Sequence, residues 1–206
     1  MLRVYAYSKG REQVPPGLFE VSNWNATDST FELPQPGRIK RDAIRLVACT
    51  LLMSAKLYSG GLERGWFTHV FIDEAGHAEE PLCLAPLSLL CMPQQTQVVL
   101  AGDPEQLGPI VLSTVSKQHG LQVSLLERLM RASPYARIRT SDSSQLPYDP
   151  RFVTKLVRNY RSHPEILKGE LAAGINRTLA RDHQLLLGRL GLGLGSKATT
   201  GPCFPW

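Results

Sequence analysis

Several features that would assign this chain to a familiar class of proteins are missing from its 206 residues. The four cysteines are widely spaced without a CxxC pair, and the five histidines form neither HxxxH nor HExxH, so neither a zinc site nor a disulfide framework is indicated. The apolar runs are too short for a membrane span, and no signal-peptide pattern opens the chain. We therefore expect a reducing, intracellular setting.

The glycine-rich phosphate loop GxxxxGK[ST] is also absent from the sequence. Apolar residues make up 43% and charged residues 20%, which is ordinary for a globular domain. The net charge of +5 favours a polyanionic partner without identifying one, and a basic protein with no nucleic-acid role fits equally well.

The stretch HVFIDEAG, residues 69–76, is the most informative part of the chain. His69–Ile72 is predicted to be a short buried strand, and two carboxylates, Asp73 and Glu74, follow it directly. Because ligands bind beyond the strand carboxyl ends in α/β sheets, the pair fits nucleotide hydrolysis, with one carboxylate on Mg²⁺ and one on the attacking water. A turn followed by a helix cap is the alternative interpretation.

A second strand, Gln97–Ala101, leads into GDPEQLGP, residues 102–109. The glycines and prolines indicate a tightly shaped loop, and Asp103 and Gln106 are expected to face the same crevice as the first carboxylates. An ordinary strand-to-helix turn is the alternative here.

Other elements are predicted from periodicity and capping residues. The expected strands are Leu2–Tyr7, Ala43–Cys49 and Phe152–Val157; the expected helices are 51–57 after a Thr50 cap, 79–90 with an acidic first turn, and 124–131 with Ser124 and Glu127 at capping-box spacing. Residues 8–42 are predicted to be irregular, with Trp24 and Phe31 as anchors. The basic cluster at residues 38–41 fits either phosphate contact or a solvated charge run.

Three loops in series, DEAG, GDPEQLGP and NYRSHP (residues 159–164), resemble motifs II, III and IV of superfamily-one helicases. DEAGHAEEP, LAGDPEQLGP, HGLQVSLLERLM and YDPRFVTKLVRNYRSHPEIL are most similar to the Upf-like RNA helicases of the Armitage and Moloney-leukaemia-virus-ten group. The resemblance covers residues 2–167. It implies an incomplete α/β, RecA-like P-loop NTPase sheet in residues 1–150 and the start of a second RecA-like domain in 151–168. Residues 169–206 diverge from the family; their Leu/Gly run at 185–195 fits neither a clean helix nor a clean strand, and we expect this low-complexity tail to be poorly ordered.

The resemblance also implies roles for individual residues. Asp73 would bind Mg²⁺, Glu74 would be the catalytic base, and Gln106 would sense the γ-phosphate of ATP within a loop shaped by Gly102 and Asp103. Arg161 would act as an arginine finger and Tyr160 would stack on adenine; the alternative for Arg161 is a solvated side chain, which is the usual state of an arginine in a basic stretch. Thr50 and Ser54 match motif Ib, which contacts RNA phosphates.

The departures from the family pattern are the missing Walker A loop and the loss of similarity after Leu167, where motifs V and VI would follow. We therefore expect a helicase fragment that does not hydrolyse ATP by itself. A non-catalytic RNA-binding or decoy module, a DNA or DNA/RNA helicase, and an unstable product are the rival hypotheses. By family, single-stranded RNA, Argonaute-type silencing proteins and a cytoplasmic location, including ribonucleoprotein granules, are the expected partners and setting.

Overall fold

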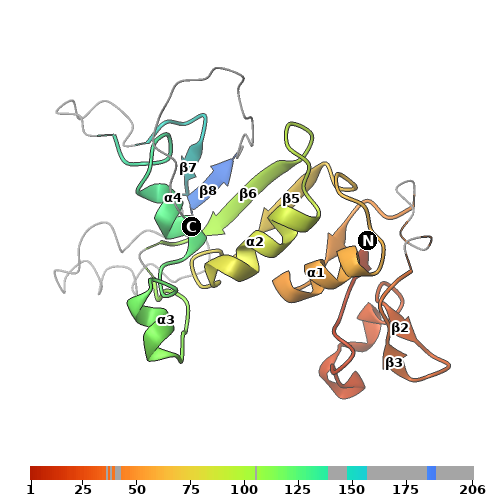
Figure 1. Ribbon diagram of the computed structural model, residues 1–206. Coiled ribbons are helices and arrows are strands. Elements are labelled where there is room, and N and C mark those ends of the chain that lie inside the picture. The colour runs from red at the N-terminus through yellow and green to blue at the C-terminus, as the bar shows by residue number, and fades with distance from the viewer. Residues whose placement is uncertain are drawn as a thin grey trace, which may run out of the picture.

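The computed structural model describes residues 1–35, 37, 39, 43–104, 106–138 and 148–156, together with the backbone of Leu185–Gly188. It confirms the predicted α/β class: helices and strands alternate along the chain, and the described strands form a parallel pair (the smaller sheet), a two-stranded hairpin and a four-stranded larger sheet (Figure 1). The smaller sheet pairs β1 (Leu2–Arg3) in parallel with β4 (Val47–Ala48).

The larger sheet carries the predicted DEAG and GDPEQLGP strands, and its order is β5–β6–β8–β7. β5 (His69–Ile72) and β6 (Gln97–Gly102) are parallel, with Ile72 opposite Leu100. β8 (Leu185–Gly188) is antiparallel to both β6 and β7 (Val153–Lys155). The parallel register brings the carboxyl ends of β5 and β6 to the same edge of the sheet, as the sequence predicted.

The helices begin where the capping residues indicated. Thr50 Oγ1 accepts a hydrogen bond from the Met53 amide at 3.4 Å and caps α1 (Leu51–Ser59). α2 (Glu80–Leu89) has a glutamate and a proline in its first turn and packs against α1. Ser124 caps α4 (Leu125–Met130) through the Glu127 amide at 3.1 Å. The Glu127 carboxylate pairs with Arg131, so only the serine half of the predicted capping box is seen.

Outside residues 8–42, a helix and a strand were missed by the sequence patterns. The short helix α3 (Thr114–Gln118), capped by Ser113, was not predicted. The run around Leu185–Gly195 was expected to be neither helix nor strand, yet Leu185–Gly188 pairs as β8. Leucines followed by glycine lack the alternation that marks a strand, and pairing with a neighbouring edge overrides such a weak local preference.

Residues 8–42 were predicted to be irregular, and this is wrong in part. The chain forms 3₁₀ turns at Arg11–Gln13 and Pro16–Leu18, then a hairpin of β2 (Trp24–Asn25) and β3 (Thr30–Phe31). Two-residue strands are too short to show periodicity, so tertiary contacts determine them. Trp24 and Phe31 are anchors as predicted, with ring centroids 5.0 Å apart.

Two hydrophobic clusters form the core. The first lies at the larger sheet and includes Ile72, Val98, Leu100, Leu126 and Val153. The second lies where α1 meets the smaller sheet and includes Val4, Ile39, Met53, Leu57 and Leu90. Burial of these side chains is the main stabilising contribution to the fold.

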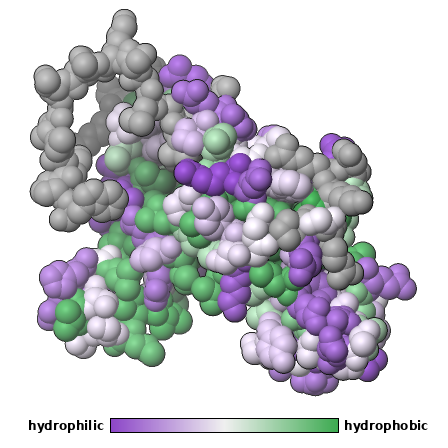
Figure 2. Space-filling view, turned by 45° about the vertical axis from the view of Figure 1, so that its right-hand side comes forward, coloured by the Kyte–Doolittle hydropathy of each residue, from purple (hydrophilic) through white to green (hydrophobic). Residues whose placement is uncertain are grey.

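Figure 2 shows the lobe that holds β2 and β3 as mostly hydrophilic, whereas hydrophobic residues also reach the surface in the middle of that face. Among the described helices, none is long and apolar enough to cross a membrane.

The hairpin depends on Asn23, which is 7% exposed. Its Oδ1 accepts from the Tyr5 amide at 2.8 Å, and its Nδ2 donates to the Tyr5 and Glu32 carbonyls at 3.0 and 2.7 Å. Asn23→Ala would remove the partner of three backbone groups, two on half-buried Tyr5 and one on Glu32. We expect the free energy of unfolding to fall by about 2–3 kcal/mol in urea denaturation. Asn25→Ala, on the exposed side of the same hairpin, is the matched control, and equal effects from the two variants would contradict this assignment.

Candidate functional site

The first site loop follows β5 without a break. Ile72, the last residue of the strand, is buried, whereas Asp73 and Glu74 are exposed beyond the sheet edge. The strand therefore anchors the loop through its apolar end and presents two carboxylates to solvent. The predicted location of this pair at a strand carboxyl end is confirmed; its chemical role remains a prediction.

Residues 73–77 form a tight turn that constrains Glu74 from several directions. The Glu74 amide donates to Asp73 Oδ1 at 3.0 Å, and the His77 amide donates to the Glu74 carbonyl at 3.0 Å. His77 Nδ1 also lies 3.3 Å from Glu74 Oε2. Glu74 itself has φ of 53°, a left-handed conformation that is uncommon for a residue with a side chain. Such strain persists where surrounding contacts enforce it, and it is concentrated at functional sites.

The second site loop follows β6. Asp103 is 6% exposed, and its Oδ2 accepts from Gln106 Nε2 at 3.1 Å. This bond fixes the direction of the Gln106 amide while the rest of that side chain stays exposed. The two polar residues predicted for this loop are therefore brought together, with the aspartate inside and the glutamine outside.

The two loops touch backbone to backbone. The Ala75 amide donates to the Ala101 carbonyl at 2.8 Å, which extends the β5–β6 pairing past the end of β5. A Cβ atom on Gly76 would lie 2.6 Å from the Asp103 carbonyl oxygen, and one on Gly102 would lie 3.0 Å from the Ala75 and Gly76 nitrogens. Only glycine permits this approach. The arrangement places Asp73 and Glu74 beside the loop that carries Asp103 and Gln106.

An ion pair between helices supports the loops. Arg128 on α4 donates to both carboxylate oxygens of Glu80 in the first turn of α2, at 2.7 and 2.6 Å. The bond to Glu80 raises the pKa of Arg128. α2 begins just after the first loop, and Leu126 of α4 lies against Gly102, where the second loop begins, so this fork joins the segments that carry the site. Sequence reasoning missed this pair, which joins residues 48 positions apart.

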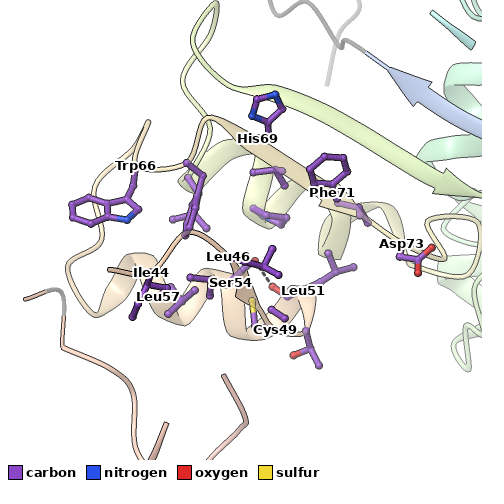
Figure 3. A pocket seen from close by; sticks show the side chains of 18 of the residues that line it. Ile44, Leu46, Cys49, Leu51, Ser54, Leu57, Trp66, His69, Phe71 and Asp73 are labelled. Carbon is purple, nitrogen blue, oxygen red and sulfur yellow. Dashed lines mark hydrogen bonds between the residues drawn. The ribbon is translucent and has the colours of Figure 1, made fainter. Parts of the chain in front are cut away.

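Thr50 and Ser54 lie on a different side of β5, in a pocket of about 940 Å³ between β4 and β5 (Figure 3). β4 and β5 are not paired with each other, so the pocket reaches the inner faces of α1 and α2. Asp73 lines one end of it. Ser54 is 6% exposed and donates its hydroxyl to the Leu51 carbonyl, whereas Thr50 is exposed. Of the two predicted phosphate contacts, Thr50 is thus the accessible one.

Several predicted residues cannot be placed. Arg161 and Tyr160 lie outside the described residues, as does most of the basic cluster at residues 38–41. The division at residue 150 stays a prediction, although β7 shares a sheet with β5 and β6 through β8.

The buried cysteines do not extend the site. Burial raises the pKa of the Cys83 and Cys91 thiols to about 11, so both remain thiols and not thiolates at neutral pH.

The site chemistry fits magnesium in a limited sense. Asp73 offers a hard, solvent-facing carboxylate, the ligand type that Mg²⁺ prefers. Among the described residues no three His, Cys, Asp or Glu side chains gather into a metal site. An ion at Asp73 would therefore draw its other ligands from water and from substrate phosphates, which is the usual mode for Mg²⁺.

Comparison with known proteins defines the class. A family model described as an AAA domain matches residues 40–114, a range that includes β4, α1, β5, α2 and β6. With the parallel β5–β6 pair and its two loops, this identifies the fold as part of a P-loop helicase domain, an incomplete RecA-like sheet.

Several relatives belong to one group of helicases. The chain is 41% identical over 166 residues to the helicase mov-10-B.1 of Danio rerio, 47% over 123 residues to the RNA helicase Mov10l1 of Mus musculus, and 40% over 124 residues to the RNA helicase armi of Drosophila melanogaster. These matches cover 81%, 60% and 60% of this chain but only 16%, 10% and 10% of the relatives. The predicted resemblance to the Armitage and Moloney-leukaemia-virus-ten group is confirmed, and the chain spans a small part of such proteins.

Gly76→Ala tests the contact between the two loops. The added methyl group would meet the Asp103 carbonyl, so either loop must shift. We expect the free energy of unfolding to fall by about 1–3 kcal/mol. Gly17→Ala is the matched control, because a Cβ there has no neighbour within 4 Å. Equal stability of the two variants in thermal or urea denaturation would show that the loops are not in contact.

Proposed function

We propose that this chain is a segment of an ATP-dependent RNA helicase, carrying most of the first RecA-like domain and the opening of the second. The complete enzyme would couple ATP hydrolysis to movement along, or unwinding of, RNA. The observation that supports this proposal is the packing of the Asp73–Glu74 loop against the Asp103–Gln106 loop at the carboxyl ends of two parallel strands. It agrees with the names of the relatives, which describe them as helicases or RNA helicases.

The proposed roles follow from what each side chain presents. Asp73 would hold Mg²⁺, which when bound offsets negative charge on the nucleotide phosphates. Glu74 would accept the proton of the attacking water; its turn and the neighbouring His77 fix where that carboxylate lies. Gln106, held by Asp103, would read the γ-phosphate state and relay it through the second loop. Arg161 as arginine finger and Tyr160 at the adenine complete the proposal for the whole enzyme.

A non-catalytic RNA-binding segment is the second candidate for the chain by itself. The sequence contains no GxxxxGK[ST] loop to cradle the phosphates, so the site has a carboxylate pair and a sensing loop without a phosphate cradle. RNA binding through phosphate contacts does not need that cradle. It would be sequence-independent and would weaken with salt.

The biological setting is proposed from the group. RNA silencing, cytoplasmic ribonucleoprotein granules and Argonaute-type partners are the expected context. Co-purification of a tagged chain with and without ribonuclease would test the partners, and imaging of the same tag would test the location.

We expect no RNA-stimulated ATP turnover by the isolated chain. The measurement is phosphate release by highly purified protein, with and without single-stranded RNA, against Glu74→Gln as the blank. Turnover that Glu74→Gln abolishes would contradict the expected inactivity and show that the site is complete. Sequencing the native transcript across both ends provides an independent check, since an upstream in-frame GxxxxGK[ST] would mark the chain as part of an active helicase.

RNA binding is expected to depend on Thr50. Thr50→Asp keeps a capping side chain on α1 but adds a negative charge at the mouth of the pocket. A like charge near a phosphate costs about 1 kcal/mol in water, so affinity should fall about fivefold in fluorescence anisotropy with labelled single-stranded RNA. Ser113→Asp, the same charge change at the cap of α3, is the control. Equal losses in both variants would indicate a general charge effect and count against a contact at Thr50. DNA of the same sequence separates an RNA from a DNA preference.

A further inference from the structure

The edge of β6 that faces away from β5 is covered by the chain's own distant segment. β8 (Leu185–Gly188) pairs antiparallel with β6, in a register that sets Leu100 opposite Leu187 and Gly102 opposite Leu185. It pairs on its other side with β7, with Thr154 opposite Leu186. Figure 1 shows β8 lying between the two strands. Eighty-two residues of sequence separate the end of β6 from the start of β8, so this pairing is a long-range contact.

The direction of each β6 amide can be worked out from bonds outside the strand. The Gln97 amide donates to the Thr68 carbonyl at 2.8 Å, and the Ala101 carbonyl accepts from Ala75, so both residues direct their backbone groups toward β5. Because these groups alternate along a strand, Val99 faces β5 as well, and Leu100 faces β8. Without β8 the backbone groups of Leu100 would be an open edge in the middle of the core.

That edge belongs to a strand with a buried apolar face. Val98 and Leu100 are fully buried in the main hydrophobic cluster. An unpaired edge on such a strand is a template for pairing with another chain, which is a recognised route to aggregation. The edge also ends at Gly102, where the second site loop begins, so whatever pairs with β6 borders the candidate site.

We propose that Leu185–Gly188 is a strap that closes the open edge of β6, stabilises the incomplete sheet and prevents association of two copies through that edge. The occupant of the edge is thus this chain's own divergent segment, and its role is carried by backbone pairing. The proposal goes beyond the helicase assignment and does not depend on it, because neither RNA nor nucleotide enters the argument.

Hydrogen exchange of individual amides in the wild-type chain gives the first test. We expect the Leu100 amide, which faces β8, to exchange as slowly as the Val99 amide, which faces β5. The Val99 amide is an internal reference, because it lies on the same strand and is measured in the same sample. Fast exchange at Leu100 beside slow exchange at Val99 would overturn the proposal without any variant.

Leu187→Pro gives the second test, since proline removes the amide that faces Leu100 and is not accommodated in a central strand. Exchange at Leu100 should rise at least about tenfold while Val99 stays slow, and light scattering should show larger species as protein concentration increases. Leu192→Pro, in the same leucine–glycine run and four positions after Gly188, the last residue of β8, is the control and should leave both readouts unchanged. Faster exchange of amides throughout the sheet in Leu187→Pro, without the same change in Leu192→Pro, also supports the strap, because the sheet then depends on β8 for its stability. Identical behaviour of the two variants would overturn it.

Discussion

The close approach of two backbone segments is the constraint on which the candidate site depends. Gly76 packs against the Asp103 carbonyl, and the Ala75 amide bonds to the Ala101 carbonyl, so the loop after β5 and the loop after β6 behave as one unit. The carboxylates of the first loop and the amide of the second are therefore held next to each other by their backbones. Any side chain at Gly76 would separate them, which makes a residue with no functional group as important for the site as the acids beside it.

The parallel pairing of β5 and β6 creates this approach, and the helices preserve it. A parallel pair needs a crossover, and α2 supplies it while burying Cys83 and Pro86. The Arg128–Glu80 fork then ties the first turn of α2 to α4, which follows the second loop. That fork is partly exposed and worth little to global stability, so its value lies in fixing the direction of the helix that leaves the first loop.

Sequence patterns predicted the parts of the structure that local chemistry determines. The apolar run before Asp73 predicted β5, the run before Gly102 predicted β6, and Thr50 and Ser124 marked the starts of α1 and α4. The patterns could not show that Gly76 contacts Asp103 or that Arg128 reaches Glu80, because these contacts depend on how separate elements pack. The patterns also missed the left-handed backbone conformation of Glu74 and its contact with His77. The spacing of three residues along a turn was the signal that could have indicated this contact. Ser54 matched a motif by position, yet its hydroxyl is bonded inside α1.

The strands of the N-terminal hairpin and β8 could not be predicted from local sequence. Each is only two to four residues long, so neither shows a period, and each exists because something else supplies its partner: Asn23 and the aromatic cluster for the hairpin, the edge of β6 for β8. One strand, β6, serves both the strap and the site. Its Val98 and Leu100 side chains lie in the core, alternate backbone groups pair with β8, and the second site loop begins at its end. A change in the strand that pairs with β6 would therefore shift Gly102 and Asp103 directly, and it would shift the first loop only through them. That order of effects links the stability of the incomplete sheet to the geometry of its candidate site.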